Sequence, residues 1–359
     1  MKKKKVYLTL ENGEVFQGYR FGANGDAQGE LVFSTGMVGY VETLTDPSNF
    51  GQIVVQTFPL VGNYGVNESD AESKRAWVSA YVVREYCEIP SNFRSEISLD
   101  EYLKKQGVVG IYGLDTRRLT TILREEGVMN ARISAKPAVE EYDDTAAYSV
   151  KNAVKTVAPT EYQTYGDENA KYTVALWNFG AKNSTIGSLL AQGCKVISVP
   201  AFAKAEEVLG TNVDGVMLSD GPGDPMENQS IVEEVKKVLG KKPVLGAGLG
   251  HELVALALGG KTAKCKYGHR GSNQPVKCLD CGKVYISTQN HGYQVVEESL
   301  KTGKVNFVNV NDGACEGIVY EELNAFTTQF APESCNDFCG GKPVLEKFFT
   351  LMRKEKENA

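Results

Sequence analysis

The segment PVLGAGLGHE, residues 243–252, contains the end of a strand, a glycine-rich turn and the start of a helix. Short apolar runs of this kind are typical of a buried strand, and LGHELVALALGG, which begins at Leu249, is typical of a buried helix. Such an elbow often presents a reactive side chain at its apex, beside backbone N–H groups that can bind an oxyanion. The apex here is Gly248, which has no side chain. The glycine spacing is therefore equally consistent with a tight strand-to-helix turn that carries no chemistry.

Strand and helix patterns alternate around this elbow. The segments before it are YTVALWNFG (172–180), AKNSTIGSLLAQG (181–193), CKVISVP (194–200), VDGVMLSDGPGDP (213–225) and SIVEEVKKVLG (230–240). This spacing predicts a doubly wound, mostly parallel sheet with helices on both faces. Ligands of such sheets bind beyond the carboxyl ends of the strands. The exit segments SDGPGDP and GAGLGHE are therefore expected to face one crevice.

The first 150 residues predict a mixed α/β domain. The segment VYLTLENGEVFQGYRFG, which begins at Val6, alternates apolar and polar residues on both sides of Asn12-Gly13 and predicts a β-hairpin. Two later segments, LDEYLKKQG and LDTRRLTTILREEG, have helical spacing. Their predicted caps and ends are Asp100 and Gly107, and Asp115 and Gly127.

A polar stretch without periodicity, APTEYQTYGDENAKY at 158–172, predicts a linker between two domains. We therefore expect an N-terminal mixed α/β domain at 1–157 and the doubly wound domain at 173–359. After Lys261 the chain is richer in strand patterns, and its last predicted helix is Pro343–Glu355.

Charge and hydropathy argue against several classes of function. The 359 residues carry a net charge of -6, which argues against nucleic acid and anionic membranes as partners. The apolar run after the basic stretch Lys2–Lys5 is too short for a signal peptide, and no segment approaches the length of a transmembrane helix. We therefore expect a cytoplasmic protein whose cysteines are thiols rather than disulfides.

Four cysteines form two closely spaced pairs, CLDC and CNDFC. Such spacings suit tetrahedral zinc, but sequence alone does not bring the two pairs together. We predict unligated thiols and no metal in this chain. Zinc is the alternative, and its ligands would be Cys278, Cys281, Cys335 and Cys339.

Several motifs carry a family resemblance. LSDGPGDP (218–225), GAGLGHE (246–252), TQNHGYQV (288–295) and QFAPES (329–334) resemble, in order and spacing, the motifs of class I, triad-type glutamine amidotransferases. FSTGMVGYVETLTDPS, GNYGVN, GIYGLDTRRLT and WNFGAKNSTIGSLLAQGCKV resemble the small subunit of carbamoyl phosphate synthetase. The resemblance extends over nearly the whole chain, from about Val6 to Arg353.

The resemblance implies a glutaminase subunit. In the family, a cysteine at the elbow attacks the side-chain amide of glutamine, and a histidine oriented by a glutamate acts as base and acid. The released ammonia travels to a large synthetase subunit, which makes carbamoyl phosphate from bicarbonate and ATP. The implied partner is therefore that large subunit, with ATP and Mg²⁺ bound there and no cofactor in this chain. We find no phosphate-binding P-loop in the sequence.

This sequence departs from the family pattern at the residues that do the chemistry. The nucleophile position is Gly248, the histidine position is Ala331, and the orienting glutamate is retained as Glu333. We therefore expect no meaningful glutaminase activity. The substrate-binding residues that the resemblance implies are Gly36, Gly221, Gly223, Leu249, Glu252, Asn290, Gly292 and Tyr293.

Three pocket residues also depart from the pattern. Gly36 replaces a serine, and Asp220 and Glu252 place carboxylates where the family has neutral amides. An acidic cleft would repel the carboxylate of glutamine and attract ammonium, so we expect weakened glutamine binding. Unselected drift of an inactive pocket is the alternative.

Substitute catalytic groups are scarce in the sequence. His251, His269 and His291 match framework positions of the family, and Cys335 is the one thiol whose place in a motif suggests proximity to Glu333. A displaced thiol would also need a nearby base.

Three hypotheses follow. The first is a small-subunit homologue with a degenerate glutaminase site, which serves as a structural or regulatory partner of a large subunit that uses free ammonia. The pathway served would be arginine or pyrimidine biosynthesis. The second is an orphan binding or interaction protein that uses the old cleft. The third is an active glutaminase with relocated catalytic groups.

Overall fold

The structure is a computed structural model that describes residues 4–137, 142–210, 212–334 and 343–358. The chain divides into two compact units, Met1–Lys151 and Asn152–Ala359, and each has hydrophobic clusters of its own. In the described ranges, no helix combines the length and the apolar character that crossing a membrane requires. The finer division predicted from the sequence, with a linker at 158–172, stays a prediction.

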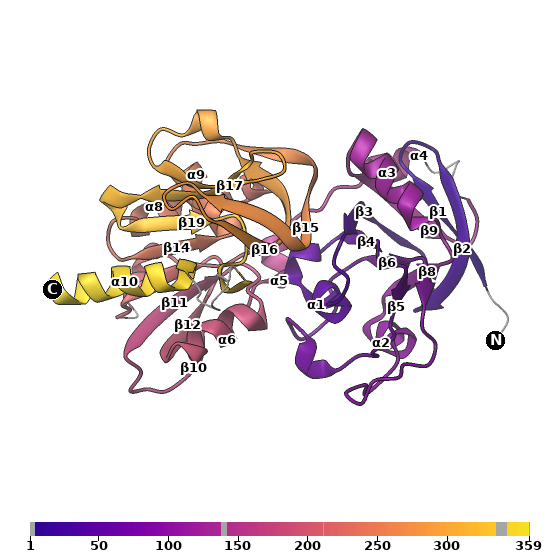
Figure 1. The fold of residues 1–359 in the computed structure, drawn as a ribbon, viewed down its shortest axis with the longest axis horizontal. Coiled ribbons are helices and arrows are strands. Elements are labelled where there is room, and N and C mark those ends of the chain that lie inside the picture. Colours follow the sequence, from indigo (N-terminus) through magenta and orange to yellow (C-terminus); the bar gives the residue numbers. More distant parts are fainter. Residues whose placement is uncertain (1–3, 138–141, 211, 335–342, 359) are drawn as a thin grey trace. The chain divides into compact units, whose positions relative to one another are not determined.

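The first unit is built on a closed barrel with the strand order β1-β2-β8-β6-β4-β3-β9 (Figure 1). Its strands are β1 (Lys5–Leu10), β2 (Val15–Gly22), β3 (Ala27–Ser34), β4 (Gln52–Gln56), β6 (Ala80–Val83), β8 (Val109–Tyr112) and β9 (Met129–Ser134), and β5 (Leu60–Val61) pairs separately with β7 (Glu85–Tyr86). The hairpin predicted about Asn12-Gly13 is confirmed as the antiparallel pair of β1 and β2. The barrel closes where β1 pairs with β9, and this contact between distant segments could not be predicted from local alternation.

Four helices of the described chain belong to this unit. They are α1 (Tyr40–Thr45), α2 (Leu99–Gln106), α3 (Thr116–Glu126) and α4 (Tyr142–Ala146). The predicted cap of α3 is confirmed, because the Asp115 side chain accepts a hydrogen bond from the backbone N–H of Arg118 at 3.0 Å. Gly107, in the left-handed region, ends α2 as predicted, and Gly127 ends α3.

The cap predicted for α2 at Asp100 is wrong. Ser98 caps this helix, in a reciprocal capping box with Glu101. The Asp100 carboxylate instead accepts a hydrogen bond from the backbone N–H of Gly22 at 2.6 Å. It therefore links α2 to β2 across the unit, which no local pattern reveals.

The second unit contains one sheet with the order β10-β12-β11-β13-β14-β19-β18-β17-β15-β16. Its strands are β10 (Gln163–Tyr165), β11 (Tyr172–Asn178), β12 (Cys194–Pro200), β13 (Gly215–Leu218), β14 (Val244–Ala247), β15 (Thr262–Cys278), β16 (Val284–Val295), β17 (Lys304–Asn309), β18 (Cys315–Tyr320) and β19 (Ala325–Thr328). Neighbours from β12 to β19 are parallel, and the other pairs are antiparallel. The predicted α/β fold is confirmed, and the antiparallel part explains the strand-rich pattern after Lys261.

Helices cover both faces of this sheet (Figure 1). One face is covered by α5 (Ala153–Val157), α7 (Ala205–Gly210), α8 (Gln229–Val238) and α9 (Leu249–Ala257). The other face is covered by α6 (Asn183–Ala191) and α10 (Pro343–Asn358). Alternate residues of β11 pack into the hydrophobic clusters on the two faces of the sheet. Ala175 and Trp177 belong to one cluster, and Val174 and Leu176 belong to the other. Because β11, β13, β14 and β19 run parallel, their exit loops meet at one edge of the sheet.

Candidate functional site

The elbow forms where β14 ends and α9 begins. Gly248 adopts φ 51° and ψ -114°, a conformation that strains any residue with a Cβ atom. Its N–H donates to the carbonyl of Thr328 at 2.9 Å, which joins the turn to the end of β19. A Cβ atom on Gly246 or Gly250 would lie 2.9 Å or 2.5 Å from a backbone oxygen. These glycines therefore permit the close approach of strand and helix on which the elbow depends.

The loop after β13 brings Asp220 to the apex of the elbow. The Oδ1 atom of Asp220 accepts hydrogen bonds from the backbone N–H groups of Gly221 at 2.8 Å and Leu249 at 3.1 Å. A Cβ atom on Gly248 would lie only 2.1 Å from the same oxygen. Gly221 and Leu249, both predicted to contact substrate, thus bind the chain's own carboxylate. Gly223, at φ 89°, lies farther along this loop.

Ala331 and Glu333 follow β19. The N–H of Ala331 donates to the carbonyl of Thr288 at 3.1 Å, so this segment lies against β16. The half-buried Glu333 carboxylate accepts a hydrogen bond from Thr185 Oγ1 at 2.9 Å, and its Oε1 lies 3.8 Å from Lys182 Nζ. Its second oxygen, Oε2, is buried without a hydrogen-bond partner. The glutamate that has no imidazole to orient is thus held by the start of α6.

Lys182 and Thr185 were not among the residues predicted for the site. Their segment follows β11, whose exit lies at the same sheet edge as the elbow. The rule that ligands gather at the carboxyl edge of parallel strands could have identified it. Both residues lie in the motif WNFGAKNSTIGSLLAQGCKV, but the resemblance implied no site residue in that motif.

Glu252 is buried in the first turn of α9, at 3% exposure. Burial raises the pKa of this carboxyl to about 8, although the Gln329 side chain donates a hydrogen bond to it at 3.1 Å. Glu252 therefore keeps its proton near neutral pH. Near neutral pH, Glu252 therefore lacks the negative charge that the sequence led us to expect. The carboxylate of Asp220 accepts hydrogen bonds from two backbone N–H groups. Of the two carboxylates that the sequence places in the cleft, only Asp220 is therefore expected to carry its charge near neutral pH.

Asn290, Gly292 and Tyr293 lie on β16, which pairs with β15. The ring of His291 anchors this stretch: its Nδ1 lies 2.7 Å from the Tyr293 carbonyl oxygen and its Nε2 lies 3.0 Å from Gln289 Oε1. Burial holds the pKa of His291 well below its usual range. His291 is therefore a structural residue of this segment.

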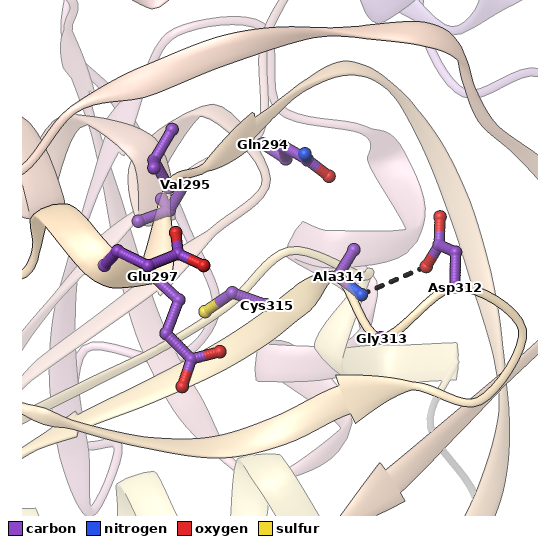
Figure 2. Close-up of a pocket in the computed structure, with 9 residues that line it drawn as sticks. Gln294, Val295, Glu297, Asp312, Gly313, Ala314 and Cys315 are labelled. Carbon is purple, nitrogen blue, oxygen red and sulfur yellow. Dashed lines mark hydrogen bonds between the residues drawn. The ribbon is translucent and has the colours of Figure 1, made fainter.

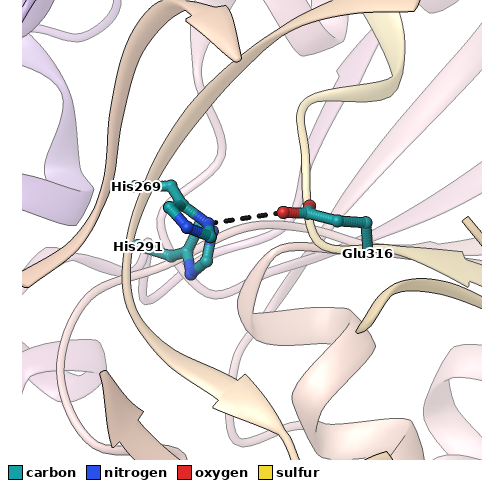
Figure 3. Close-up of side chains that lie close together, drawn as sticks. All are labelled: His269, His291 and Glu316. Carbon is teal, nitrogen blue, oxygen red and sulfur yellow. Dashed lines mark ion pairs between the residues drawn. The ribbon is translucent and has the colours of Figure 1, made fainter. Parts of the chain in front are cut away.

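A second histidine, His269, lies against His291, and both rings adjoin Glu316 (Figure 3). His269 Nδ1 is 3.3 Å from Glu316 Oε1, and its Nε2 is 2.9 Å from Asp312 Oδ2. Burial opposes the charged imidazole, but hydrogen bonding and attraction to Glu316 and Asp312 raise the pKa of His269. Ligand atoms of His269, His291 and Glu316 lie within 4.8 Å of one another, which is close enough for a metal ion. Because each ring nitrogen already faces an oxygen, we interpret this cluster as a charged hydrogen-bond network.

A cavity of about 260 Å³ lies beside the end of β16 and the turn before β18 (Figure 2). Glu297 and Asp312 stand on opposite sides of it, and Cys315 lies between them. Burial raises the pKa of the Cys315 thiol to about 12. This thiol is therefore protonated at neutral pH and is a poor nucleophile.

Gly36 and the candidate zinc ligands come from segments other than the elbow. Gly36 belongs to the first unit, on the loop after β3, where its carbonyl accepts a hydrogen bond from the Gln56 side chain. Of the candidate zinc ligands, Cys278 is buried and Cys281 exposed at the turn between β15 and β16. Cys335 and Cys339 lie outside the described residues.

The chain matches two family models. Residues 8–133 match the carbamoyl-phosphate synthase small chain, CPSase domain, and residues 175–351 match glutamine amidotransferase class-I. The carbamoyl phosphate synthase small chain of Clostridium perfringens is 47% identical over 348 residues, covering 96% of this chain and 98% of that protein. That of Bacillus caldolyticus is 43% identical over 355 residues, covering 98% and 97%. That of Syntrophotalea carbinolica is 41% identical over 374 residues, covering 99% of both.

Proposed function

The chain belongs to the carbamoyl-phosphate synthase small-chain family, and from this premise we propose that it is a small chain without glutaminase activity. It pairs with a large chain that binds ATP and Mg²⁺ and takes free ammonia. Its own role is structural or regulatory, in the cytoplasm, in arginine or pyrimidine biosynthesis. It carries no cofactor.

One observation supports this proposal above all: the elbow keeps its backbone but has neither a nucleophile nor a base. Hydrolysis by this route needs a thiolate to attack the amide carbon and an imidazole to pass its proton to the leaving ammonia. Gly248 supplies no attacking atom, and Ala331 can neither take nor give a proton. Glu333 is instead paired with Lys182 and Thr185.

Relocated catalytic groups find no support among the described residues. Burial raises the pKa of Cys194 to about 11 and of Cys265 to about 12, so both thiols are protonated at neutral pH. Burial lowers the pKa of His251 to about 3, which makes it too weak a base at that pH. Cys281 has a lowered pKa but is exposed at a turn, hydrogen-bonded with Cys278. These observations disfavour an active glutaminase.

Co-expression with a carbamoyl phosphate synthase large chain tests the proposal. We expect the two chains to co-purify and to form carbamoyl phosphate from ammonium salts. With glutamine as the nitrogen source, we expect no product and no release of glutamate. The large chain alone, assayed with ammonium, is the control for any regulatory effect.

Two results would contradict the proposal in different ways. Steady glutamate release by the purified chain would show an active glutaminase. A large chain that never co-purifies would favour the orphan binding protein.

A further inference from the structure

Two backbone N–H groups converge on one oxygen at the apex of the elbow. Leu249, the residue after the apex, and Gly221, on the neighbouring loop, donate to Asp220 Oδ1 at 3.1 Å and 2.8 Å. An oxyanion hole is built in this way, from the amide after the nucleophile and one from an adjacent loop, with donors about 2.7–3.1 Å from the oxyanion. The Asp220 oxygen thus sits where a reaction's negative oxygen would be bound.

The same carboxylate also fills the space of a side chain at the apex. A Cβ atom on Gly248 would lie 2.1 Å from Oδ1 and 2.3 Å from Cγ of Asp220. Non-bonded carbon and oxygen atoms do not approach so closely, since ordinary contacts begin near 3.5 Å. Asp220 in this position and any side chain at residue 248 therefore exclude each other.

We propose that Asp220 is an internal occupant of the oxyanion hole, which closes the elbow to substrate independently of the lost nucleophile and base. The inference rests on the proposed function. It adds a third obstacle to glutamine hydrolysis, beside the missing nucleophile and the missing base. A restored thiol at residue 248 would have to displace the Asp220 carboxylate, which would then compete with substrate for the two N–H donors while lying beside the thiol. Both effects oppose reaction, because the developing oxyanion shares its donors with Asp220 and a nearby carboxylate raises the pKa of a thiol.

A capping role for Asp220 is compatible with this geometry but predicts a different outcome. Gly248, the N-cap of α9, offers no side-chain cap, and a carboxylate near a helix N-terminus is stabilising. If Asp220 acted only as a cap, Asp220→Ala would lower the stability by the same amount whichever residue occupied position 248. Mutual exclusion makes the two positions depend on each other.

A four-member thermal unfolding series separates these outcomes: the natural chain, Gly248→Ala, Asp220→Ala and the double variant. We expect Gly248→Ala to lower Tm by at least about 4 °C in the natural chain. In the Asp220→Ala background we expect about half that loss, because the positive-φ strain remains but the displaced carboxylate does not. Equal losses in the two backgrounds would overturn the proposal. If Gly248→Ala does not fold, recovery of folding in the double variant counts as support and failure of both counts against.

The chemical test restores the missing groups. Gly248→Cys with Ala331→His is compared with the same pair plus Asp220→Asn or Asp220→Ala. We expect the Asp220 variants to release glutamate about 100-fold faster, as for recovery of an oxyanion donor. We also expect the introduced thiol to react with iodoacetamide at lower pH in them. Equal rates and equal pH profiles with and without Asp220 would overturn the inference.

The two proposals fail separately in these experiments. Glutamate release by the unaltered chain would refute the loss of glutaminase activity. Full activity of the Cys/His pair with Asp220 in place would refute only the occupied oxyanion hole.

Discussion

Replacing Gly250 with alanine is expected to lower the free energy of unfolding of the second unit by about 3 kcal/mol or more. A Cβ atom at this position would lie 2.5 Å from the carbonyl oxygen and 2.7 Å from the Cβ atom of Leu218. The carbonyl belongs to buried strand β13 and cannot move aside as a flexible side chain would. Helix α9 must therefore shift away from the sheet, which also stretches the hydrogen bond from Gly250 N–H to the Ser219 carbonyl.

Gly187→Ala is the matched control for this prediction. Gly187 lies within α6, and a Cβ atom there would meet no heavy atom within 4 Å. We expect alanine at this position to stabilise the chain by about 0.5–1 kcal/mol, because glycine is a poor helix former. Urea unfolding of both full-length variants measures the difference. An unchanged midpoint for Gly250→Ala would contradict the close approach of strand and helix.

Glu252→Gln is expected to change how stability depends on pH. In the unfolded chain this carboxyl loses its proton near its ordinary pKa of 4.5, whereas burial in the folded chain raises the pKa to about 8. Between these values the folded state binds more protons, so stability is fully present below pH 4.5 and is lost as the pH rises to 8. The shift corresponds to a loss on the order of 5 kcal/mol for the fully buried group. Glutamine has no proton to lose, so the variant escapes this loss.

Denaturation curves at several pH values between 5 and 9 would measure this effect. We expect the natural chain and Glu252→Gln to differ little at pH 5 and the variant to be clearly more stable at pH 9. Asp224→Asn is the control, because Asp224 contributes less than burial to the shift. Parallel pH profiles for the natural chain and Glu252→Gln would show that Glu252 is ionised in the folded state.

The helix caps show which structural features can be predicted from residues that are close in the sequence. Asp115 and Gly107 were predicted because capping depends on hydrogen bonds within one helical turn. Asp100 was wrongly predicted to cap α2, because Ser98 forms a capping box with Glu101, three residues later. The Asp100 carboxylate was then free to bind Gly22, which a reading of neighbouring residues cannot detect.

The candidate site likewise has features that the local sequence predicted and features that it did not. The glycine spacing around Gly248 predicted a strand–turn–helix elbow, and the structure has that elbow. The sequence also suggested that Asp220 and Glu252 would make the cleft acidic. Burial keeps the proton on Glu252, so residue type alone predicted the wrong charge at that position. Nothing in the sequence indicated that Asp220 would bind the backbone amides of the elbow.

By itself, the sequence determined the alternation of strands and helices around the elbow, the hairpin of β1 and β2, the ends of α2 and α3, and that the apex of the elbow has no side chain. These features depend on periodicity and on contacts between residues a few positions apart. The tertiary structure alone decided that the barrel closes through β1 and β9, that Lys182 pairs with Glu333, and that Asp220 occupies the elbow. Those features depend on which distant backbone groups meet and on how much water is excluded around them, and both are set only when the sheets and helices pack.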